Sequence, residues 1–218
     1  MKKIIFTLIL VLLSYVPYSH ALEAMTKKEL KTTTGQAGVA DFSVSENTIR
    51  TFVNTHIATW TEIDSVKLGY YDNGSGTPGW DQNWTNLSFG DSSNDFVIDG
   101  FIIKADFDNL SSTNPNLKRL IIGTNRVNGT FTGTFNSFSG AYDPSLTADT
   151  SDDGNDKTIY SRQNLGDKTF TFDSSVSNKG FFLILSPNAA HSGIQSVLGY
   201  TESSIDGKFA LNEWWDSH

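Results

Sequence analysis

The sequence predicts an all-β protein, an antiparallel β-sandwich or jelly-roll-like domain with a short N-terminal helix. Phe131 and Phe135 alternate with threonines, which is typical of a strand with one buried face and one exposed face. Residues 181–185 are apolar on both faces, as in a central strand. Clusters of Gly, Asn, Pro and Ser separate such short runs, as turns do in sandwich proteins.

The first 21 residues have the three parts of a secretory signal peptide. Lys2 and Lys3 form a positive start, residues 4–16 form an apolar stretch, and Ser19 and Ala21 are the small residues before a cleavage site. The apolar stretch is shorter than the about 20 residues that a spanning helix needs. We therefore expect cleavage after Ala21, export to the periplasm, extracellular space or cell surface of a bacterium, and no membrane span in the mature chain.

Composition excludes several classes of function. The chain has no cysteine, which excludes disulfides, thiolate metal sites and a cysteine nucleophile. Its net charge is −8, and loss of Lys2 and Lys3 with the signal peptide makes it −10 for residues 22–218. Nucleic-acid binding draws most of its affinity from cationic contacts with phosphates, so no nucleic-acid partner is expected.

Residues 22–38 differ from the rest of the chain and predict a short helix. Thr26 and Glu29 have the spacing of a capping box, and Met25 and Leu30 have that of a hydrophobic staple. Gly35 is placed to end the helix. A helix this short is marginal in water, so we interpret it as a helical tag recognised by another protein.

Residues 39–218 are expected to form the β-sandwich domain. Residues 49–57 fit either a strand or a short helix, and Asn128 with Gly129 predicts a turn. Five apolar residues are predicted to share one strand face, which Asp99 interrupts: Val97, Phe101, Ile103, Ala105 and Phe107.

The start of the mature chain also carries a resemblance. Leu22, Met25, Glu29 and Leu30, followed by Gly35-Gln36-Ala37-Gly38, resemble the opening segment of a bacterial family of exported β-rich proteins, labelled pilus-system (FilA-type) proteins. Residues 96–101, Phe-Val-Ile-Asp-Gly-Phe, are similar to a strand common in that family. The resemblance implies an exported β-rich protein that is associated with a pilus.

An acidic segment is the best candidate for a metal site. Oxygen-bearing side chains recur there at alternate positions around Gly154, as at the start of a calcium loop. The twelfth position is Tyr160 instead of the bidentate Glu of an EF-hand. A solvated acidic turn is the alternative. The candidate calcium ligands are Asp149, Ser151, Asp153, Asn155 and Asp156.

A second segment combines flat aromatic rings with polar side chains, as sugar-binding sites do. Trp80 and Trp84 could stack on a sugar, and Asp81 and Asn83 could bind its hydroxyl groups. The alternative is that the two tryptophans anchor this segment to the core.

No catalytic motif is evident. The mature histidines, His56, His191 and His218, form no zinc-hydrolase pattern, and no nucleophile elbow is present. We therefore expect an exported non-enzymatic structural or interaction module of the cell envelope or surface, with envelope or surface proteins as partners. A carbohydrate-binding module is the alternative, followed by a secreted glycan hydrolase, whose paired carboxylates need no sequence motif.

Overall fold

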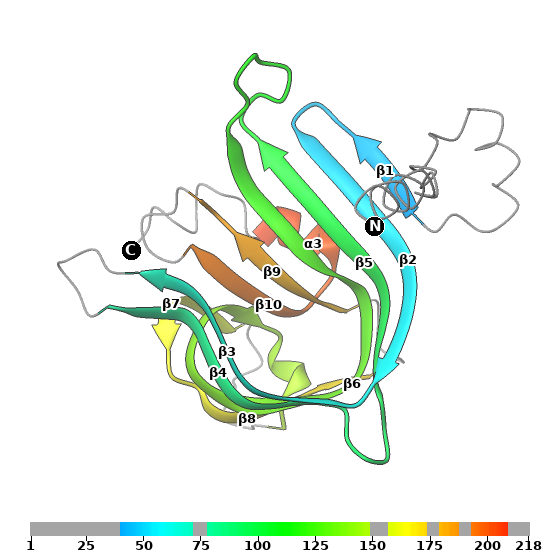
Figure 1. Ribbon diagram of the computed structural model, residues 1–218, viewed down its shortest axis with the longest axis vertical. Helices are drawn as coiled ribbons and strands as arrows, with labels where there is room; N and C mark the ends of the chain where they lie inside the picture. The colour runs from blue at the N-terminus through cyan, green and yellow to red at the C-terminus, as the bar shows by residue number, and fades with distance from the viewer. Residues whose placement is uncertain (1–39, 72–77, 149–156, 174–178, 188–192, 209–218) are drawn as a thin grey trace, which may run out of the picture. The chain divides into compact units, whose positions relative to one another are not determined.

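A computed structural model describes residues 40–71, 78–148, 157–173, 179–187 and 193–208 (Figure 1). Contacts divide the chain into two units, Met1–Ala37 and Gly38–His218, and all described residues belong to the second. The expected signal peptide (1–21) and most of the helical tag (22–38) lie in the first unit, outside the described residues. The described elements are β1 (Ala40–Val44), β2 (Thr48–Thr59), β3 (Thr61–Tyr71), β4 (Gly79–Phe89), β5 (Phe96–Phe107), β6 (Leu117–Tyr142), the 3₁₀ turn η1 (Pro144–Leu146), β7 (Lys157–Gln163), β8 (Gly166–Phe172), β9 (Gly180–Leu185), β10 (Ile194–Tyr200) and α3 (Glu202–Lys208).

Strand β6 organises the fold because it pairs with six other strands. It is 26 residues long and pairs with β5 and β9 near its start, with β4 and β8 in its middle, and with β7 and β10 near its end. The ends of β6 join β1, β2, β5, β7, β9 and β10 in sheet A, and its middle joins β3, β4 and β8 in sheet B. Among the described strands, every pairing is antiparallel except that of β10 with β6.

The predicted turn at Asn128 and Gly129 is wrong, because β6 continues through both residues. Gly129 instead has a φ of 112° where the strand passes from sheet A to sheet B. A Cβ there would lie 2.9 Å from the carbonyl oxygen of Asp95. Glycine therefore permits a conformation and a close approach that other residues would strain, and β6 curves through this region (Figure 1).

The first hydrophobic core is mainly aromatic and combines residues of sheets A and B. Phe131 is 1% exposed, and Phe135, Phe138 and Phe170 are fully buried. The Phe131 ring centroid lies 5.5 Å from that of Phe135 and 6.0 Å from that of Phe170. Full burial of such a side chain is worth about 1.5–3 kcal/mol, so these rings are a main source of stability.

A second core lies on the opposite face of sheet A, under α3. Phe182 and Val197 face each other in register on β9 and β10, and Ile205 of α3 joins their cluster. The guanidinium of Arg50 on β2 donates two hydrogen bonds to the Glu202 carboxylate of α3, at 2.6 and 2.7 Å. Packing and this paired contact together fix the short helix on the sheet.

The predicted all-β class is confirmed. Sheets A and B are continuous through β6 in one 10-stranded open sheet, which is consistent with a sandwich-like fold. Residues 49–57 lie in β2, which settles the choice between strand and helix in favour of strand. Residues 181–185 lie in β9, with buried Phe182 and Ile184 alternating with half-buried neighbours. In the described part of the chain, no helix is long and apolar enough to cross a membrane.

Candidate functional site

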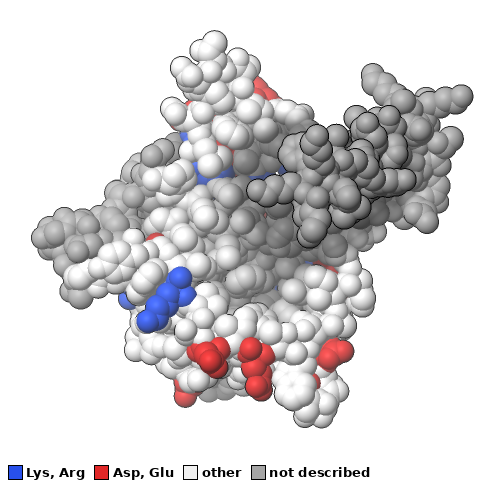
Figure 2. All heavy atoms as spheres, in the orientation of Figure 1, with Lys and Arg blue, Asp and Glu red and all other residues white. Residues whose placement is uncertain are grey.

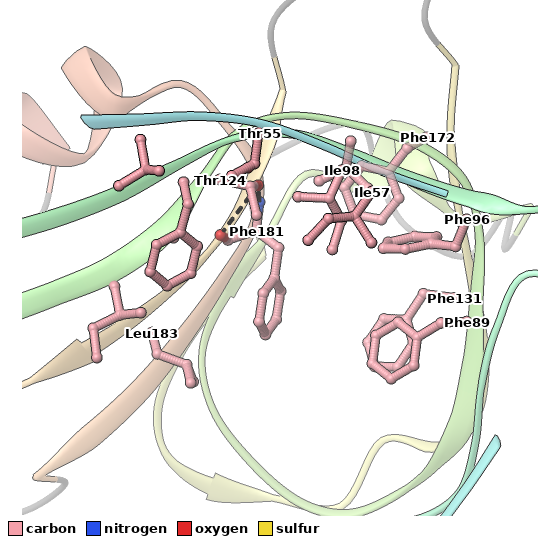
Figure 3. Close-up of a pocket in the computed structure, with 15 residues that line it drawn as sticks. Thr55, Ile57, Phe89, Phe96, Ile98, Thr124, Phe131, Phe172, Phe181 and Leu183 are labelled. Atoms are coloured by element: carbon pink, nitrogen blue, oxygen red, sulfur yellow. Dashed lines mark hydrogen bonds between the residues drawn. The ribbon is translucent and has the colours of Figure 1, made fainter. Parts of the chain in front are cut away.

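An apolar pocket of about 420 Å³ lies where sheet A bends toward sheet B. Leu183 lies at one end of it, and Phe89, Phe96 and Phe131 lie together at the other (Figure 3). Strands β2, β5, β6 and β9 supply most of its wall, and β4 and β8 supply one residue each. Its fifteen lining residues are Val53, Thr55, Ile57, Phe89, Phe96, Ile98, Phe101, Ile122, Gly123, Thr124, Val127, Phe131, Phe172, Phe181 and Leu183.

The aromatic end of the pocket is fixed by ring packing. Phe89 stacks on Phe131 with ring centroids 4.6 Å apart and an interplanar angle of 8°. Phe96 meets Phe89 edge-on at 5.3 Å and Phe172 edge-on at 6.1 Å. Because these rings hold one another through several contacts, this end of the pocket is formed before any ligand arrives.

A register break between β2 and β5 positions the middle of the pocket wall. Phe101 of β5 pairs with Val53 of β2, whereas Ile98 of β5 pairs with Ile57 of β2. A separation of three residues along β5 therefore corresponds to one of four residues along β2. Gly100 lies at this break with a φ of 71°, and a Cβ there would lie 2.5 Å from the Phe52 ring. The break therefore turns both Ile98 and Phe101 toward the pocket and directs Asp99 to the other face.

This break corrects the predicted face of β5. The sequence pattern grouped Val97 with Phe101, but Ile98 is the residue that joins Phe101 in the pocket wall. Asp99 pairs instead with His56 and Arg126 on the outer face, and its carboxylate accepts hydrogen bonds from both. The His56 bond and then the Arg126 bonds hold the pKa of Asp99 below its usual value.

Among the residues that the structure describes, the pocket wall contains no ionisable side chain, and its two polar side chains are threonines. The Thr124 hydroxyl accepts a hydrogen bond from the backbone N–H of Phe181 at 3.0 Å. The Thr55 hydroxyl oxygen is buried and has no hydrogen-bond partner among the described residues. A buried polar atom without a partner costs about 1–3 kcal/mol, so Thr55 is the one lining group for which a ligand could supply a missing bond.

The apolar wall continues along the same face of sheet A beyond the pocket. Ile103 of β5, Ile122 of β6 and Leu183 of β9 are direct partners across the sheet, so their side chains lie on one face. Ile103 is 39% exposed, whereas Ile122 and Leu183 are half-buried. The next row along this face is also apolar: Ile49, Ala105, Leu120 and Leu185.

The surface in the view of Figure 2 carries acidic side chains along its lower edge, and most of the described surface above them is uncharged. The residues that the structure describes contain no group of three or more His, Asp or Glu placed to hold a metal ion. The five candidate calcium ligands, Asp149, Ser151, Asp153, Asn155 and Asp156, lie outside the described residues, so calcium binding there stays a prediction.

The four candidate carbohydrate-binding residues lie on β4 in different environments. The Trp84 ring is 3% exposed and stacks on Phe138 in the first core, with centroids 6.2 Å apart. Asp81 is 1% exposed, and its carboxylate accepts the backbone N–H of Ile194 at 2.9 Å. Asn83 is half-buried.

Trp80 is half-buried, and its ring meets Tyr70 at 5.2 Å with an interplanar angle of 62°. Trp84 is thus a core anchor, and Trp80 with the 59% exposed Tyr70 is the part of this segment that faces outward. Sugar binding by these residues stays a prediction.

Sequence reasoning missed the pocket as a site. The apolar residues 181–185 indicated a central strand and the alternation in β5 indicated sheet faces, but neither pattern indicated a pocket. Comparisons of the chain with family models, with curated proteins and with solved structures find no match.

Proposed function

We propose that this protein is an exported, non-enzymatic interaction module of the cell envelope or surface, which works by holding an apolar group in the pocket between its sheets. The observation that carries the proposal is the pocket itself, which is about 420 Å³ in volume and has no ionisable side chain among the described residues that line it. Small-molecule pockets span roughly 300–1,000 Å³ and are predominantly apolar. The signal-peptide pattern supports export, and the resemblance of residues 22–38 to FilA-type proteins supports an association with a pilus.

The lining argues for binding rather than for catalysis at this place. Acid–base catalysis needs a group that exchanges a proton, and covalent catalysis needs an activated nucleophile. The Thr124 hydroxyl already accepts a hydrogen bond from the Phe181 N–H, and Thr55 has no base beside it among the described lining residues. Such a wall can desolvate an apolar group and fix one polar atom, which suffices for recognition.

A dye-binding experiment tests the proposed function. N-phenyl-1-naphthylamine is uncharged and fluoresces in apolar surroundings, so we expect residues 22–218 to bind it saturably. Val53→Trp places an indole in the half-buried pocket wall and should abolish this signal. Val97→Trp is the matched control, since Val97 is a half-buried residue of β5 outside this pocket.

The outcomes separate clearly. Binding by the wild type and by Val97→Trp, with loss in Val53→Trp, supports the pocket as the site. Absence of saturable binding by the wild type, or equal binding by both tryptophan variants, would overturn the proposal. Circular dichroism of all three proteins establishes that each is folded.

One observation favours carbohydrate binding as a second candidate. Tyr70 and Trp80 form an edge-to-face pair near neighbouring ends of β3 and β4, and Tyr70 is 59% exposed. An aromatic ring at the surface can stack on the apolar face of a sugar. Retention of the wild type, but not of Trp80→Ala, on an insoluble polysaccharide would support this role.

A further inference from the structure

We infer that the pocket takes an acyl chain whose carbonyl group is esterified or amidated, with the chain inside the pocket and the carbonyl oxygen at Thr55. This inference rests on the proposed function and specifies the ligand class of the same site. The elongated apolar wall, the uncharged lining and the unpartnered hydroxyl each constrain the ligand independently.

The shape of the wall favours a linear group over a compact one. The pocket runs from the aromatic end at Phe131 to Leu183 (Figure 3), and the half-buried rows of sheet A extend the apolar surface past Leu183 to Leu185. Residues two apart on a strand are about 7 Å apart, so each further row adds room for several methylene groups. A flexible hydrocarbon chain can follow this curved path and bury its surface throughout.

The chemistry of the wall favours a neutral ligand. In the described part of the chain, no Lys, Arg or His lines the pocket. A free carboxylate held here would be desolvated without a counter-charge, which is costly. An ester or amide carbonyl has no such charge but still accepts a hydrogen bond.

The Thr55 hydroxyl can donate the hydrogen bond that such a carbonyl accepts, and it lies near the rim of the pocket. Its hydroxyl oxygen is buried and has no partner among the described residues. Strand β1 pairs with β2 only as far as Val53, so within the described residues Thr55 and Ile57 lie on an uncovered sheet edge. Ile57 is 48% exposed. A carbonyl bound by Thr55 would therefore lie at the rim of the pocket, with its head group directed to solvent.

Displacement of bound N-phenyl-1-naphthylamine tests the inference. The competitors share a chain of twelve carbons. 1-Lauroylglycerol carries an ester, laurate carries a carboxylate, and a dodecyl glycoside carries an acetal linkage without a carbonyl. All are used below their micelle-forming concentrations at pH 8. We expect 1-lauroylglycerol to displace the dye at about tenfold lower concentration than laurate.

Thr55→Val removes the hydroxyl and keeps the side-chain volume. It should weaken 1-lauroylglycerol about tenfold, equivalent to about 1.4 kcal/mol, and leave the dodecyl glycoside unchanged. Thr55→Ser keeps the hydroxyl and should restore the wild-type order. Equal effects of Thr55→Val on both compounds would overturn the role of the hydroxyl, and preference for laurate would overturn the neutral acyl group.

The experiment also separates the two levels of the proposal. If the dye binds but no alkyl compound displaces it, the acyl inference fails and the proposed function stands. If the dye itself does not bind, the proposed function fails. Phosphatidylcholine vesicles form a further arm: retention of the protein on them identifies a membrane lipid as the source of the chain, and displacement by monomeric 1-lauroylglycerol alone identifies a free ester.

Discussion

Replacement of Phe182 by alanine should destabilise the protein more than replacement of the phenylalanine beside it. Phe182 is fully buried in the second core, where it faces Val197 and lies over Gly123. A Cβ on Gly123 would overlap the Phe182 ring, so the two residues are closely fitted. Truncation removes the ring and leaves a cavity between sheet A and α3.

The expected loss for Phe182→Ala is about 3–5 kcal/mol of unfolding free energy, the usual cost of such a truncation. This is a large part of the roughly 5–15 kcal/mol that stabilises a typical domain. Phe181→Ala should cost less, because Phe181 is only half-buried and already borders a pocket. Phe42→Ala, at a residue 64% exposed, should change the free energy by less than about 0.5 kcal/mol.

Urea denaturation followed by circular dichroism measures these differences. If Phe182→Ala does not fold, Phe182→Leu gives a smaller cavity and a measurable midpoint. A loss under about 1 kcal/mol for Phe182→Ala, or a larger loss for Phe181→Ala, would refute the assignment of the two faces of β9. The dye assay then tests Phe181 separately, because that ring belongs to the pocket.

Three other predictions concern acid stability, a backbone contact and processing. Burial raises the pKa of Asp143, but the Lys179 ion pair and hydrogen bonds outweigh it and hold that pKa below its usual value. As the pH falls through about 4, the Asp143 carboxyl is protonated in the unfolded chain before it is protonated in the folded protein. The stabilisation that its ionised form contributes is therefore present above that pH and is lost below it. Asp143→Asn should flatten this acid slope in urea titrations. Gly140→Ala should cost about 4 kcal/mol or prevent folding, since a Cβ there would overlap the backbone of β10. Gly166→Ala also has a positive φ but open space, and should cost only about 1–2 kcal/mol; equal midpoints for these two variants would contradict the proposed contact. Mass spectrometry of the exported protein should show Leu22 as its first residue, and a product that retains the first 21 residues would contradict cleavage.

The sequence was informative wherever a local pattern decides the structure. The alternation of Phe131 and Phe135 with threonines predicted a half-buried strand, and both rings are buried between the sheets. The apolar character of Phe182 and of its neighbours predicted a strand covered on both faces, which β9 is in part. Such patterns depend on period two alone, which any sheet imposes.

The bend and the pocket were beyond such reasoning because they depend on distant partners. Asn128 and Gly129 have turn chemistry, yet pairing with β5 and β8 carries the strand through them. Likewise, the register break near Gly100 exists only in relation to β2, and no local pattern distinguishes it from a regular strand. Whether apolar faces meet or leave a gap between them is decided by these long-range pairings.

Both faces of sheet A carry apolar side chains, but these side chains are covered to different extents on the two faces. On one face, α3 covers Phe182 and its neighbours, and an ion pair from Arg50 fixes the helix there. On the other face, the described residues leave Ile103 and the adjoining rows half-covered beside an uncharged pocket. Apolar side chains at such positions gain little for the stability of the isolated chain, because water still reaches them. These side chains would contribute more to stability when a bound acyl chain excludes water from them. The buried Thr55 hydroxyl would gain a hydrogen bond to the ligand's carbonyl when the same ligand binds. An acyl ligand would therefore cover the apolar side chains on this face of sheet A, as α3 covers those on the other face.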